Sequence, residues 1–338
     1  MKTLLSTLSF ALVYFWALLS VAQNDASYIS LQGEALFPEG IHTLPNGNLL
    51  VGGFGDGSLQ EISPNGTVSY FSASGENGMV IAVGMAIDED RNRLWVANFN
   101  FNTGDGVPGS QMKVFDLESK TVIATLPETF IPGVFFNEVV IDPLGNVYIS
   151  DTFNPQIWKA DADLSAVEVF VNNDLLSNPA PDQPFDLNGL SITPDDNYLI
   201  ASVMDRLDAG DGKLVRIGLK DKSVENISLK GKAAIAAFAG SDGMFFHEQQ
   251  LIMVNVFSAA GAIITASFDA DYRTATLTIR DRYQGVYDRP TASAVWNGKL
   301  WTVNSQLDHI IDDANGAKGT PHEKPFKIVG VPLSKVLK

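Results

Sequence analysis

Residues 136–151 read FNEVVIDPLGNVYISD, and this stretch decides the fold. An apolar run leads into an Asp-Pro-Leu-Gly-Asn segment, and a second apolar run ends at Asp151. Pro, Gly and Asn favour tight turns, while Val147, Tyr148 and Ile149 favour strands, so the stretch predicts two strands joined by a turn. Asn137 lies at the start of the first strand, where pairing alone does not require a polar side chain.

The same pattern recurs along the chain. Aligned on the second strand, the copies are EGIHTLPNGNLLVGG from Glu39, VGMAIDEDRNRLWVAN from Val83, NEVVIDPLGNVYISD from Asn137, NGLSITPDDNYLIAS from Asn188, DGMFFHEQQLIMVN from Asp242 and PTASAVWNGKLWTVN from Pro290. The intervals are 44, 54, 51, 54 and 48 residues. They average about 50 residues, which is the length of one four-stranded propeller blade. Six copies predict an all-β protein, a six-bladed β-propeller.

Further short strands are predicted between the copies, at 59–62, 67–71, 111–117, 121–126, 157–160, 167–171, 213–217, 223–229, 263–268 and 274–280. Closing the ring requires one blade with strands from both ends of the chain, because an open ring exposes strand edges. We expect Tyr28 to Leu36 to pair in the blade built by residues 290–304 and 326–332. Segments 99–110 and 172–184 are predicted to be loops, and long loops on one rim of a propeller usually cover its central mouth.

The N-terminus has the features of a signal peptide. Residues 4–22 are almost wholly apolar, follow Lys2 and end in Ser20-Val21-Ala22. This predicts a signal peptide at 1–22 with cleavage after Ala22, and a single propeller domain at 23–338 that is secreted or periplasmic. The alternative is an uncleaved N-terminal membrane anchor, since about 20 apolar residues span a bilayer. No basic cluster follows the apolar run to fix it in a membrane.

Composition and charge exclude several classes of function. Removal of residues 1–22 takes away Lys2, so the formal net charge of −16 becomes −17. A surface this acidic repels nucleic acid and anionic lipid, so we expect neither as a partner, and we expect a monomer. The chain has no cysteine, which rules out disulfides, thiolate zinc sites and a cysteine nucleophile. No Gly-x-Ser-x-Gly elbow of a serine hydrolase is present.

The first position of each copy carries the chemical signal. In order, it is occupied by Glu39, Val83, Asn137, Asn188, Asp242 and Pro290. If these residues begin the strands nearest the propeller axis, all six lie at one end of the channel. Four of them offer side-chain oxygens, and two carboxylates with two amides suit a hard cation such as Ca²⁺, whose charge the carboxylates balance.

A simpler interpretation of the same residues is a set of turns. Glu39, Asn188 and Asp242 each precede a glycine, and Asn-Gly and Asp-Gly are common turn pairs. Val83 and Pro290 show that the repeat does not need a polar residue at this position. The recurrence of oxygen-bearing side chains at one repeat position therefore favours a shared metal site.

These motifs resemble the gluconolactonase/regucalcin (senescence marker protein, SMP-30) family. The resemblance lies in Glu39-Gly40, Asn137, Asn188-Gly189 and Asp242-Gly243-Met244, in this order along the mature chain. That family is similar in architecture to diisopropylfluorophosphatase and paraoxonase. The resemblance implies that Glu39, Asn137, Asn188 and Asp242 bind Ca²⁺, or another divalent cation such as Mg²⁺, Mn²⁺ or Zn²⁺. It also implies a metal-dependent hydrolase of a small-molecule lactone or ester, with Asp242 as the catalytic base.

The departures from the family pattern concern the substrate. In sugar-lactone members an arginine lies two residues before the first Asn and an Asp follows it, whereas here these positions hold Phe135 and Glu138. Together with Phe130 and Phe136, Phe135 gives the mouth an apolar flank, which favours a less polar lactone or ester. The expected substrate pocket comprises Phe135, Phe136 and Glu138, with Asn304, Gln306 and His309 from the segment after the last repeat strand.

Two other classes of protein remain open. One is a non-catalytic propeller that binds a ligand or partner and uses the ion for stability, and the other is a metal-free relative of the strictosidine synthase type. Among the remaining polar residues, His42 and His247 are expected to be structural, and His309 either relays protons at the mouth or lies in a solvated loop. Asp205, Asp208 and Asp211 lack the alternating spacing of a calcium loop and are expected to turn a hairpin.

Overall fold

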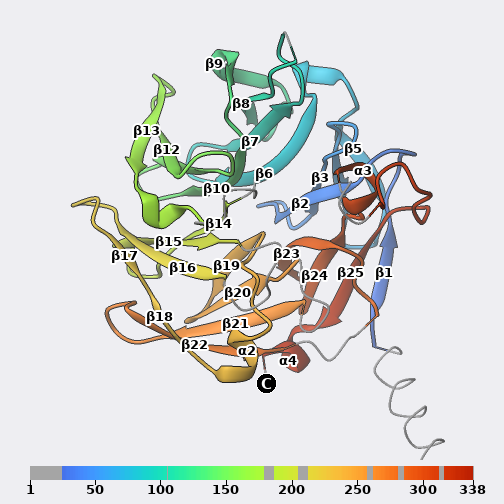
Figure 1. Ribbon diagram of the computed structural model, residues 1–338. Helices are drawn as coiled ribbons and strands as arrows, with labels where there is room; N and C mark the ends of the chain where they lie inside the picture. The colour runs from blue at the N-terminus through green and yellow to red at the C-terminus, as the bar shows by residue number, and fades with distance from the viewer. Residues whose placement is uncertain are drawn as a thin grey trace, which may run out of the picture.

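Short apolar strands separated by tight turns pair into six small sheets, which are arranged in a ring (Figure 1). The structure is a computed structural model that describes residues 25–104, 106–178, 186–204, 212–256, 262–280, 285–311 and 316–337. The predicted six-bladed β-propeller is confirmed. The predicted signal peptide and Asp205, Asp208 and Asp211 lie outside the described residues. Within those residues, no helix has the length and apolar character needed to cross a membrane.

Four blades are built from consecutive strands. Blade 1 contains β2 (Pro38–Thr43), β3 (Leu49–Gly53), β4 (Leu59–Ile62) and β5 (Val68–Ser72). Blade 2 contains β6 (Ile81–Asp88), β7 (Arg93–Asn100), β8 (Gly109–Asp116) and β9 (Val122–Pro132). Blade 3 contains β10 (Phe136–Ile141), β11 (Val147–Asp151), β12 (Gln156–Ala160) and β13 (Val167–Asn172). Blade 4 contains β14 (Leu187–Ile192), β15 (Tyr198–Val203), β16 (Lys213–Gly218) and β17 (Val224–Asn226).

Blade 5 has five strands, and one of them arrives from blade 4. Its strands are β18 (Ser228–Lys230), β19 (Met244–His247), β20 (Gln250–Val254), β21 (Ile263–Phe268) and β22 (Thr274–Ile279). The predicted strand 223–229 is therefore wrong as a single element: its first part is β17, and its last residues begin β18, which pairs parallel with β22. The break falls at Ile227, which is buried in the core that Leu214 and Leu277 also form, so the chain crosses between blades there.

Blade 6 closes the ring. It combines β23 (Pro290–Trp296), β24 (Lys299–Asn304) and β25 (Lys327–Pro332) with β1 (Ser27–Ser30) from the other end of the chain. β1 pairs antiparallel with β25, with Tyr28 opposite Val329, so the predicted closure is confirmed with a shorter N-terminal strand. Short helices complete the described fold: η1 (Glu76–Gly78), η2 (Asp174–Leu176), α2 (Lys232–Ile235), α3 (Asp308–Ile311) and α4 (Leu333–Val336).

The innermost strands of the blades, which are β2, β6, β10, β14, β19 and β23, lie beside one another around the axis. β2 contacts β6 and β23, and β10 contacts β6 and β14, so these strands face one another across blade boundaries. Five of them shift register near their start, between Pro38 and Ile41, Ala82 and Met85, Phe136 and Val139, Leu187 and Leu190, and Pro290 and Ser293. Such bulges re-aim side chains at barrel and propeller mouths.

The register of these shifts corrects one position of the predicted repeat. Pro290 pairs with Asn304 as Phe136 pairs with Asp151, so the sixth equivalent of Asn137 is Thr291 and not Pro290. The last copy has one residue fewer than the third copy between the two residues that pair at its ends. An alignment on the second strand therefore places its first position one residue too early.

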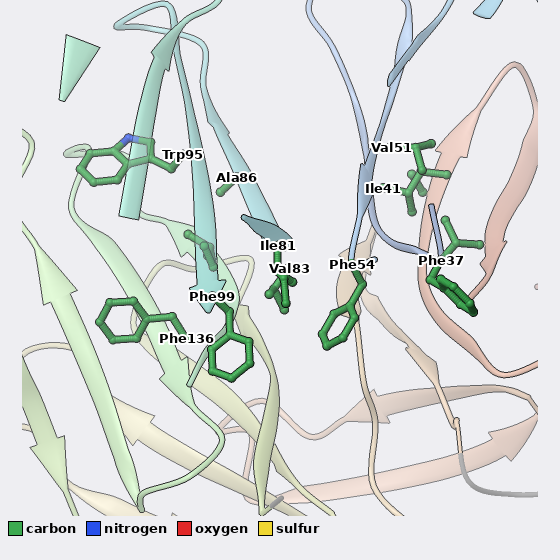
Figure 2. Close-up of a cluster of buried hydrophobic side chains, with 14 of the residues drawn as sticks. Phe37, Ile41, Val51, Phe54, Ile81, Val83, Ala86, Trp95, Phe99 and Phe136 are labelled. Carbon is green, nitrogen blue, oxygen red and sulfur yellow. The ribbon is translucent and has the colours of Figure 1, made fainter. Parts of the chain in front are cut away.

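The largest core cluster lies between blades 1, 2, 3 and 6. Figure 2 shows Phe54, Val83 and Phe99 as members of this cluster, together with Trp95 and Phe136. Trp95, Phe99 and Phe136 have no exposed surface. Burial of side chains this large contributes about 1.5–3 kcal/mol each to stability, relative to exposure. The inner strands of these blades are therefore held in place by a tightly packed core.

Candidate functional site

One end of the channel opens into a cavity lined by one side chain from each blade. The six residues, called the mouth ring below, are Glu39, Val83, Asn137, Asn188, Asp242 and Thr291. Glu39, Asn137 and Asn188 lie on β2, β10 and β14, and Asp242 lies just before β19. The four candidate ligands are thus brought to one cavity, and each is only 4% to 7% exposed. They lie in strand bulges or at a strand start and do not form the alternative set of hairpin turns.

Hydrogen bonds between neighbouring blades hold the ring in place. The Gly189 amide donates to the Ser241 carbonyl at 3.2 Å, and the Gly243 amide donates to the Thr291 carbonyl at 2.7 Å. The Thr291 hydroxyl donates to the Glu39 carbonyl at 2.8 Å and so joins blade 6 to blade 1. The backbone beneath the candidate ligands is therefore fixed before any ligand arrives.

In the protein alone, the ionised forms of the two carboxyl groups of the ring are unfavourable. Burial raises the pKa of Glu39 well above its usual value, and the nearby carboxyl groups of Asp242 and Glu138 raise it further. Burial also raises the pKa of Asp242 to about 7, against an opposing hydrogen bond from Asn188. Two buried carboxyl groups without a positive partner disfavour ionisation, and an ion of opposite charge reverses this effect.

The two amides offer oxygen atoms to the same space. Asn188 Oδ1 is buried and has no hydrogen-bond partner in the described part of the chain, while its Nδ2 lies 3.5 Å from Met204 Sδ. Asn137 Nδ2 donates to the Thr152 hydroxyl at 3.0 Å, so this hydrogen bond is made by the amide nitrogen and not by Oδ1. A buried oxygen without a hydrogen-bond partner lowers the stability of the protein by about 1–3 kcal/mol, and a bound ligand would remove this penalty.

This donor set fits a hard divalent cation. Two carboxylates and two amide oxygens, with no soft donor, are what Ca²⁺ and similar ions bind in proteins. Over the described ranges no three His, Asp or Glu side chains form a metal-binding group. A cation at this ring would therefore depend on Asn137 and Asn188 as much as on Glu39 and Asp242.

An aromatic wall borders the ring on the side of blades 1 to 3. Phe54, Phe101, Phe135 and Phe153 line the cavity, and Phe99 supports them from the core. Phe99 stacks on Phe135 with ring centroids 4.3 Å apart, and it meets Phe101 edge-on at 4.9 Å. Phe135 and Phe153 are 5.2 Å apart. Of the three phenylalanines expected to form an apolar flank, Phe135 lines the cavity, whereas Phe130 and Phe136 are not among its lining residues, and Phe54, Phe101 and Phe153 complete the wall.

A buried carboxylate fixes this wall. Asp151 Oδ1 accepts hydrogen bonds from the backbone amides of Phe135 at 3.1 Å and Phe153 at 3.2 Å. Its Oδ2 accepts from Asn154 Nδ2 at 2.9 Å and from Trp158 Nε1 at 3.1 Å. Burial raises the pKa of Asp151 against these bonds. Asp151, the last residue of the stretch 136–151, therefore positions two phenylalanines of the mouth.

Blade 6, next to blade 1, brings charged side chains to the cavity. Arg289 and Asp308, from blade 6, line it together with Leu307 and Ile311. Arg289 Nε lies 3.6 Å from Asp308 Oδ2. Neither charged residue is predicted by the sequence, since neither belongs to a motif and Asp308 lies outside the six repeat copies.

Several residues expected in the pocket have other places. Phe136 is fully buried and packs edge-on against Trp158 at 5.5 Å. Glu138 lies deeper, in a cavity of the channel beyond the mouth ring. Burial, with the Asp242 carboxyl as the second cause, raises the pKa of Glu138 to about 8.

The three residues predicted after the last repeat strand hold loops together. Asn304 Nδ2 donates to the Val286 carbonyl at 3.0 Å, and its Oδ1 accepts from the Asp288 amide at 3.1 Å. The Gln306 side chain accepts from the Glu323 amide at 2.7 Å. His309 Nδ1 lies 2.7 Å from the Thr320 hydroxyl. None of the three is among the residues that line the mouth cavity.

Comparisons with known proteins agree on the fold. No family model matches the chain, and no curated protein matches it. The structure is similar to the major allergen Mala s 1 of Malassezia sympodialis, with a TM-score of 0.64 and 16% identity over 90% of this chain and 95% of that one. It is similar to a gluconolactonase from Xanthomonas campestris, with a TM-score of 0.57 and 13% identity over 91% and 90% of the two chains. It is also similar to the PQQ-bound aldose sugar dehydrogenase from Streptomyces coelicolor, with a TM-score of 0.55 and 15% identity over 91% and 98%.

At these identities the comparisons show a six-bladed propeller of the kind that gluconolactonases use, and nothing finer. Propellers of this shape carry different chemistries, as the dehydrogenase illustrates. Function must therefore be argued from the mouth of this particular chain.

Proposed function

We propose that this protein is a divalent-metal-dependent hydrolase of a lactone or related ester of low polarity. The observation that carries the proposal is the mouth ring, where Glu39, Asn137, Asn188 and Asp242 bring four oxygen-bearing side chains to one buried cavity. The unpartnered Asn188 Oδ1 supports it further. The likeness in fold to a gluconolactonase is consistent with this class of reaction.

Each group has a role in this proposal. A bound divalent cation would polarise a carbonyl group and stabilise the negative oxygen that forms when water adds. Glu39 and Asp242 supply the two negative charges that hold the ion, and Asn137 and Asn188 supply neutral oxygens. Asp242 accepts the proton of the attacking water, because a carboxylate beside a positive charge stays ionised and within reach of that water.

The walls of the mouth suit a substrate of low polarity. Phe54, Phe101, Phe135 and Phe153 offer rings and no hydrogen-bonding groups, so a sugar lactone with many hydroxyls would lose hydrogen bonds to water there. An apolar substituent gains by the same contact. The fixed positions of Phe135 and Phe153 favour one orientation of the substrate against the ring.

Turnover tests this proposal directly. The wild-type protein is screened with lactones, aryl esters and phosphotriesters while Ca²⁺, Mg²⁺, Mn²⁺ and Zn²⁺ are varied in turn. Asp242→Asn is expected to lower kcat by about 100-fold or more, and a chelator should do the same. Glu168→Gln, on the exposed outer strand of blade 3, is the matched control. Hydrolysis that survives both Asp242→Asn and the chelator would refute the catalytic claim.

A second candidate is a binding propeller in which the ion has a structural role. The observation in its favour is that the candidate ligands come from four different blades, 1, 3, 4 and 5, so an ion here would tie the ring together. A ligand that binds only the folded state raises stability by about 2.7 kcal/mol at 100 times its Kd. This candidate predicts melting that is sensitive to a chelator, with no turnover of any lactone or ester.

A further inference from the structure

Three blades use the same side chain to hold the segment that precedes their mouth-ring residue. In blades 2, 5 and 6 this side chain is an asparagine near the end of the second strand. Its amide oxygen accepts from a backbone N–H, and its amide nitrogen donates to the carbonyl two residues earlier. We call this arrangement the amide clasp. The three clasps are Asn98 with Val80 N at 2.8 Å and Gly78 O at 3.1 Å, Asn255 with Ala239 N at 3.2 Å and Ala237 O at 2.8 Å, and Asn304 with Asp288 N at 3.1 Å and Val286 O at 3.0 Å.

Blade 3 has an aspartate at this position. Asp151 pairs with Phe136, the residue before Asn137, as Asn98 and Asn304 pair with the residues before Val83 and Thr291. Asp151 Oδ1 accepts from the Phe135 amide at 3.1 Å, which is the oxygen half of a clasp. A carboxylate has no hydrogen to donate, and here Asn154 Nδ2 donates to the Gly133 carbonyl at 2.9 Å and to Asp151 Oδ2 at 2.9 Å. Two residues thus replace the single asparagine of the other clasps.

The exchange adds contacts to the aromatic wall. Asp151 Oδ1 also accepts from the Phe153 amide at 3.2 Å, and Oδ2 accepts from Trp158 Nε1 at 3.1 Å. Asp151 has no exposed surface, and all four of these partners are donors, so an acceptor-only group suits the position. One carboxyl group therefore bonds two segments at once, the one before β10 that carries Phe135 and the one after β11 that carries Phe153.

We propose that Asp151 and Asn154 are positioning residues that make the mouth selective for a lactone with an aromatic substituent on its ring. Phe135 and Phe153 line the cavity 5.2 Å apart, and Phe99 stacks on Phe135 at 4.3 Å, so these rings are held both from the backbone and from the core. The substituent lies on this wall while the lactone carbonyl is at the mouth ring. Because the wall borders one side of the ring, one of the two mirror-image forms of such a lactone is preferred. The inference rests on the proposed function, since it names the substrate class of the same site.

The neighbour of Asp151 gives a second route by which a substitution could act. The Thr152 hydroxyl accepts from Asn137 Nδ2 at 3.0 Å, so a disturbance at Asp151 could reach the mouth ring instead of the wall. The Kd of Ca²⁺ and the turnover of an unsubstituted lactone report on the ring. The preference for an aromatic substituent reports on the wall.

Two sets of probes measure these quantities on the purified protein at one fixed Ca²⁺ concentration. The substrates are γ-butyrolactone and each enantiomer of γ-phenyl-γ-butyrolactone, for which kcat and KM are determined separately. The corresponding lactams, with and without the phenyl group, resist hydrolysis, and their Kd values are measured by calorimetry. In the wild-type protein the phenyl group should raise kcat/KM by about tenfold or more, as burial of a ring of this size allows.

Asp151→Asn turns an amide nitrogen toward two donors, so the two wall segments should lose their fixed positions. The phenyl preference should fall by about fivefold or more, through KM, and the ratio between enantiomers should fall with it. The Ca²⁺ Kd and the kcat for γ-butyrolactone should change by less than about twofold, because the wall does not contact the ion.

Two further variants test the clasp itself. Asn154→Ala, at a partly exposed position, should give a smaller loss of phenyl preference in the same direction, and it carries the test if Asp151→Asn does not fold. The double variant Asp151→Asn with Asn154→Ala should recover part of the preference relative to Asp151→Asn. In it the new amide nitrogen can donate to the Gly133 carbonyl, as in blades 2, 5 and 6, and water can reach the partly exposed Trp158.

Asn304→Asp is the matched control, because it places a carboxylate opposite the Val286 carbonyl in a clasp that holds no ring of the aromatic wall. It should lower stability to urea and leave the phenyl preference unchanged. The proposal is overturned if Asn304→Asp and the blade 3 variants lower the preference equally. It is also overturned if the blade 3 variants weaken Ca²⁺ binding and slow all lactones alike, or if the wild-type protein binds both lactams equally. A lactam preference that depends on Asp151 without any hydrolysis would refute the proposed function alone, whereas hydrolysis with no such preference would refute this inference alone.

Discussion

Two successive positions at the mouth end of the inner strands are occupied by opposite kinds of residue. The first is the mouth ring, in which four of six side chains carry oxygen ligands. The second, called the glycine ring below, is formed by Gly40, Gly84, Glu138, Gly189, Gly243 and Ala292. Residues that are neighbours in the sequence are thus selected for different reasons. The first ring needs oxygen-bearing side chains, and the second ring needs small residues that leave room for the next blade.

The spacing between blades explains the glycine ring. A Cβ atom on Gly84 would lie 2.0 Å from the Asn137 carbonyl oxygen, and one on Gly189 would lie 2.3 Å from the Asp242 carbonyl oxygen. On Gly40 it would lie 2.7 Å from the Val83 carbonyl oxygen. The glycine of one blade therefore packs directly on the backbone of the next blade's mouth residue, and this contact sets how closely the candidate ligands approach one another.

The largest expected effect comes from breaking this contact. Gly84→Ala places a methyl group against the Asn137 carbonyl and should lower the free energy of unfolding by on the order of 4 kcal/mol, since a backbone atom cannot move aside as a side chain can. Urea denaturation followed by tryptophan fluorescence measures the change.

Gly47→Ala is the matched control for that substitution. No atom lies within 4 Å of a Cβ built there, but its φ of 83° makes alanine strained. It should cost about 1 kcal/mol, the penalty of the left-handed backbone alone. Equal losses for the two variants would show that contact between the blades does not constrain the glycine ring.

Much of this arrangement could be predicted from the sequence. The 2-residue alternation, the turn residues and the recurrence of one strand pair identify six blades, and the closing strand follows from the need to cover edges. The oxygen-bearing residues were visible because they recur at one repeat position. The glycines after them were visible too, but Glu39-Gly40 and Asn188-Gly189 are as typical of turns as of a bulge packed against a neighbouring strand, and only the pairing distinguishes the two.

What the sequence concealed is set by long-range geometry. Thr291 was missed because the last copy is one residue shorter between its paired ends. Arg289 and Asp308 are 19 positions apart and belong to no pattern, and only the closure of blade 6 brings them to the mouth. Asn304 and Gln306 were expected to face a ligand, but polar side chains near a strand end also serve to bind loop backbone, and composition does not tell these roles apart.

Glu138 is the ionisable residue of the glycine ring, and the next prediction concerns its replacement in Glu138→Gln. Its pKa of about 8 means that the carboxyl group stays neutral in the folded protein at pH values where the unfolded chain has lost the proton. In the presence of a chelator, the unfolding free energy should therefore fall as the pH rises from about 4.5 to about 8, by on the order of 3 kcal/mol from this group.

Glu138→Gln should remove the part of the fall that Glu138 contributes, and the rest of the fall belongs to Glu39 and Asp242, whose pKa values are raised in the same direction. Urea denaturation at a series of pH values measures the slope, with Glu168→Gln on the exposed strand as control. A variant with the slope of the wild-type protein would mean that Glu138 is ionised in the folded channel, and that the second ring tolerates charge as readily as the first.

His42 lines the same channel cavity as Glu138 and gives the smallest effect, with the opposite sign. Burial lowers its pKa to about 4, so the imidazole stays neutral in the folded protein while the unfolded chain takes up a proton below about pH 6.5. Stability should therefore be lost as the pH falls from about 6.5 to about 4, by about 1 kcal/mol, since the channel is open enough for water to soften the penalty. The carboxyl groups titrate over the same pH range with the opposite and larger effect, so the contribution of His42 is the difference between variants: relative to the wild-type protein, His42→Gln should gain about 1 kcal/mol near pH 4 and nothing near pH 7. An unchanged difference between the two proteins from pH 7 to pH 4 would mean that the imidazole is already solvated in the folded channel.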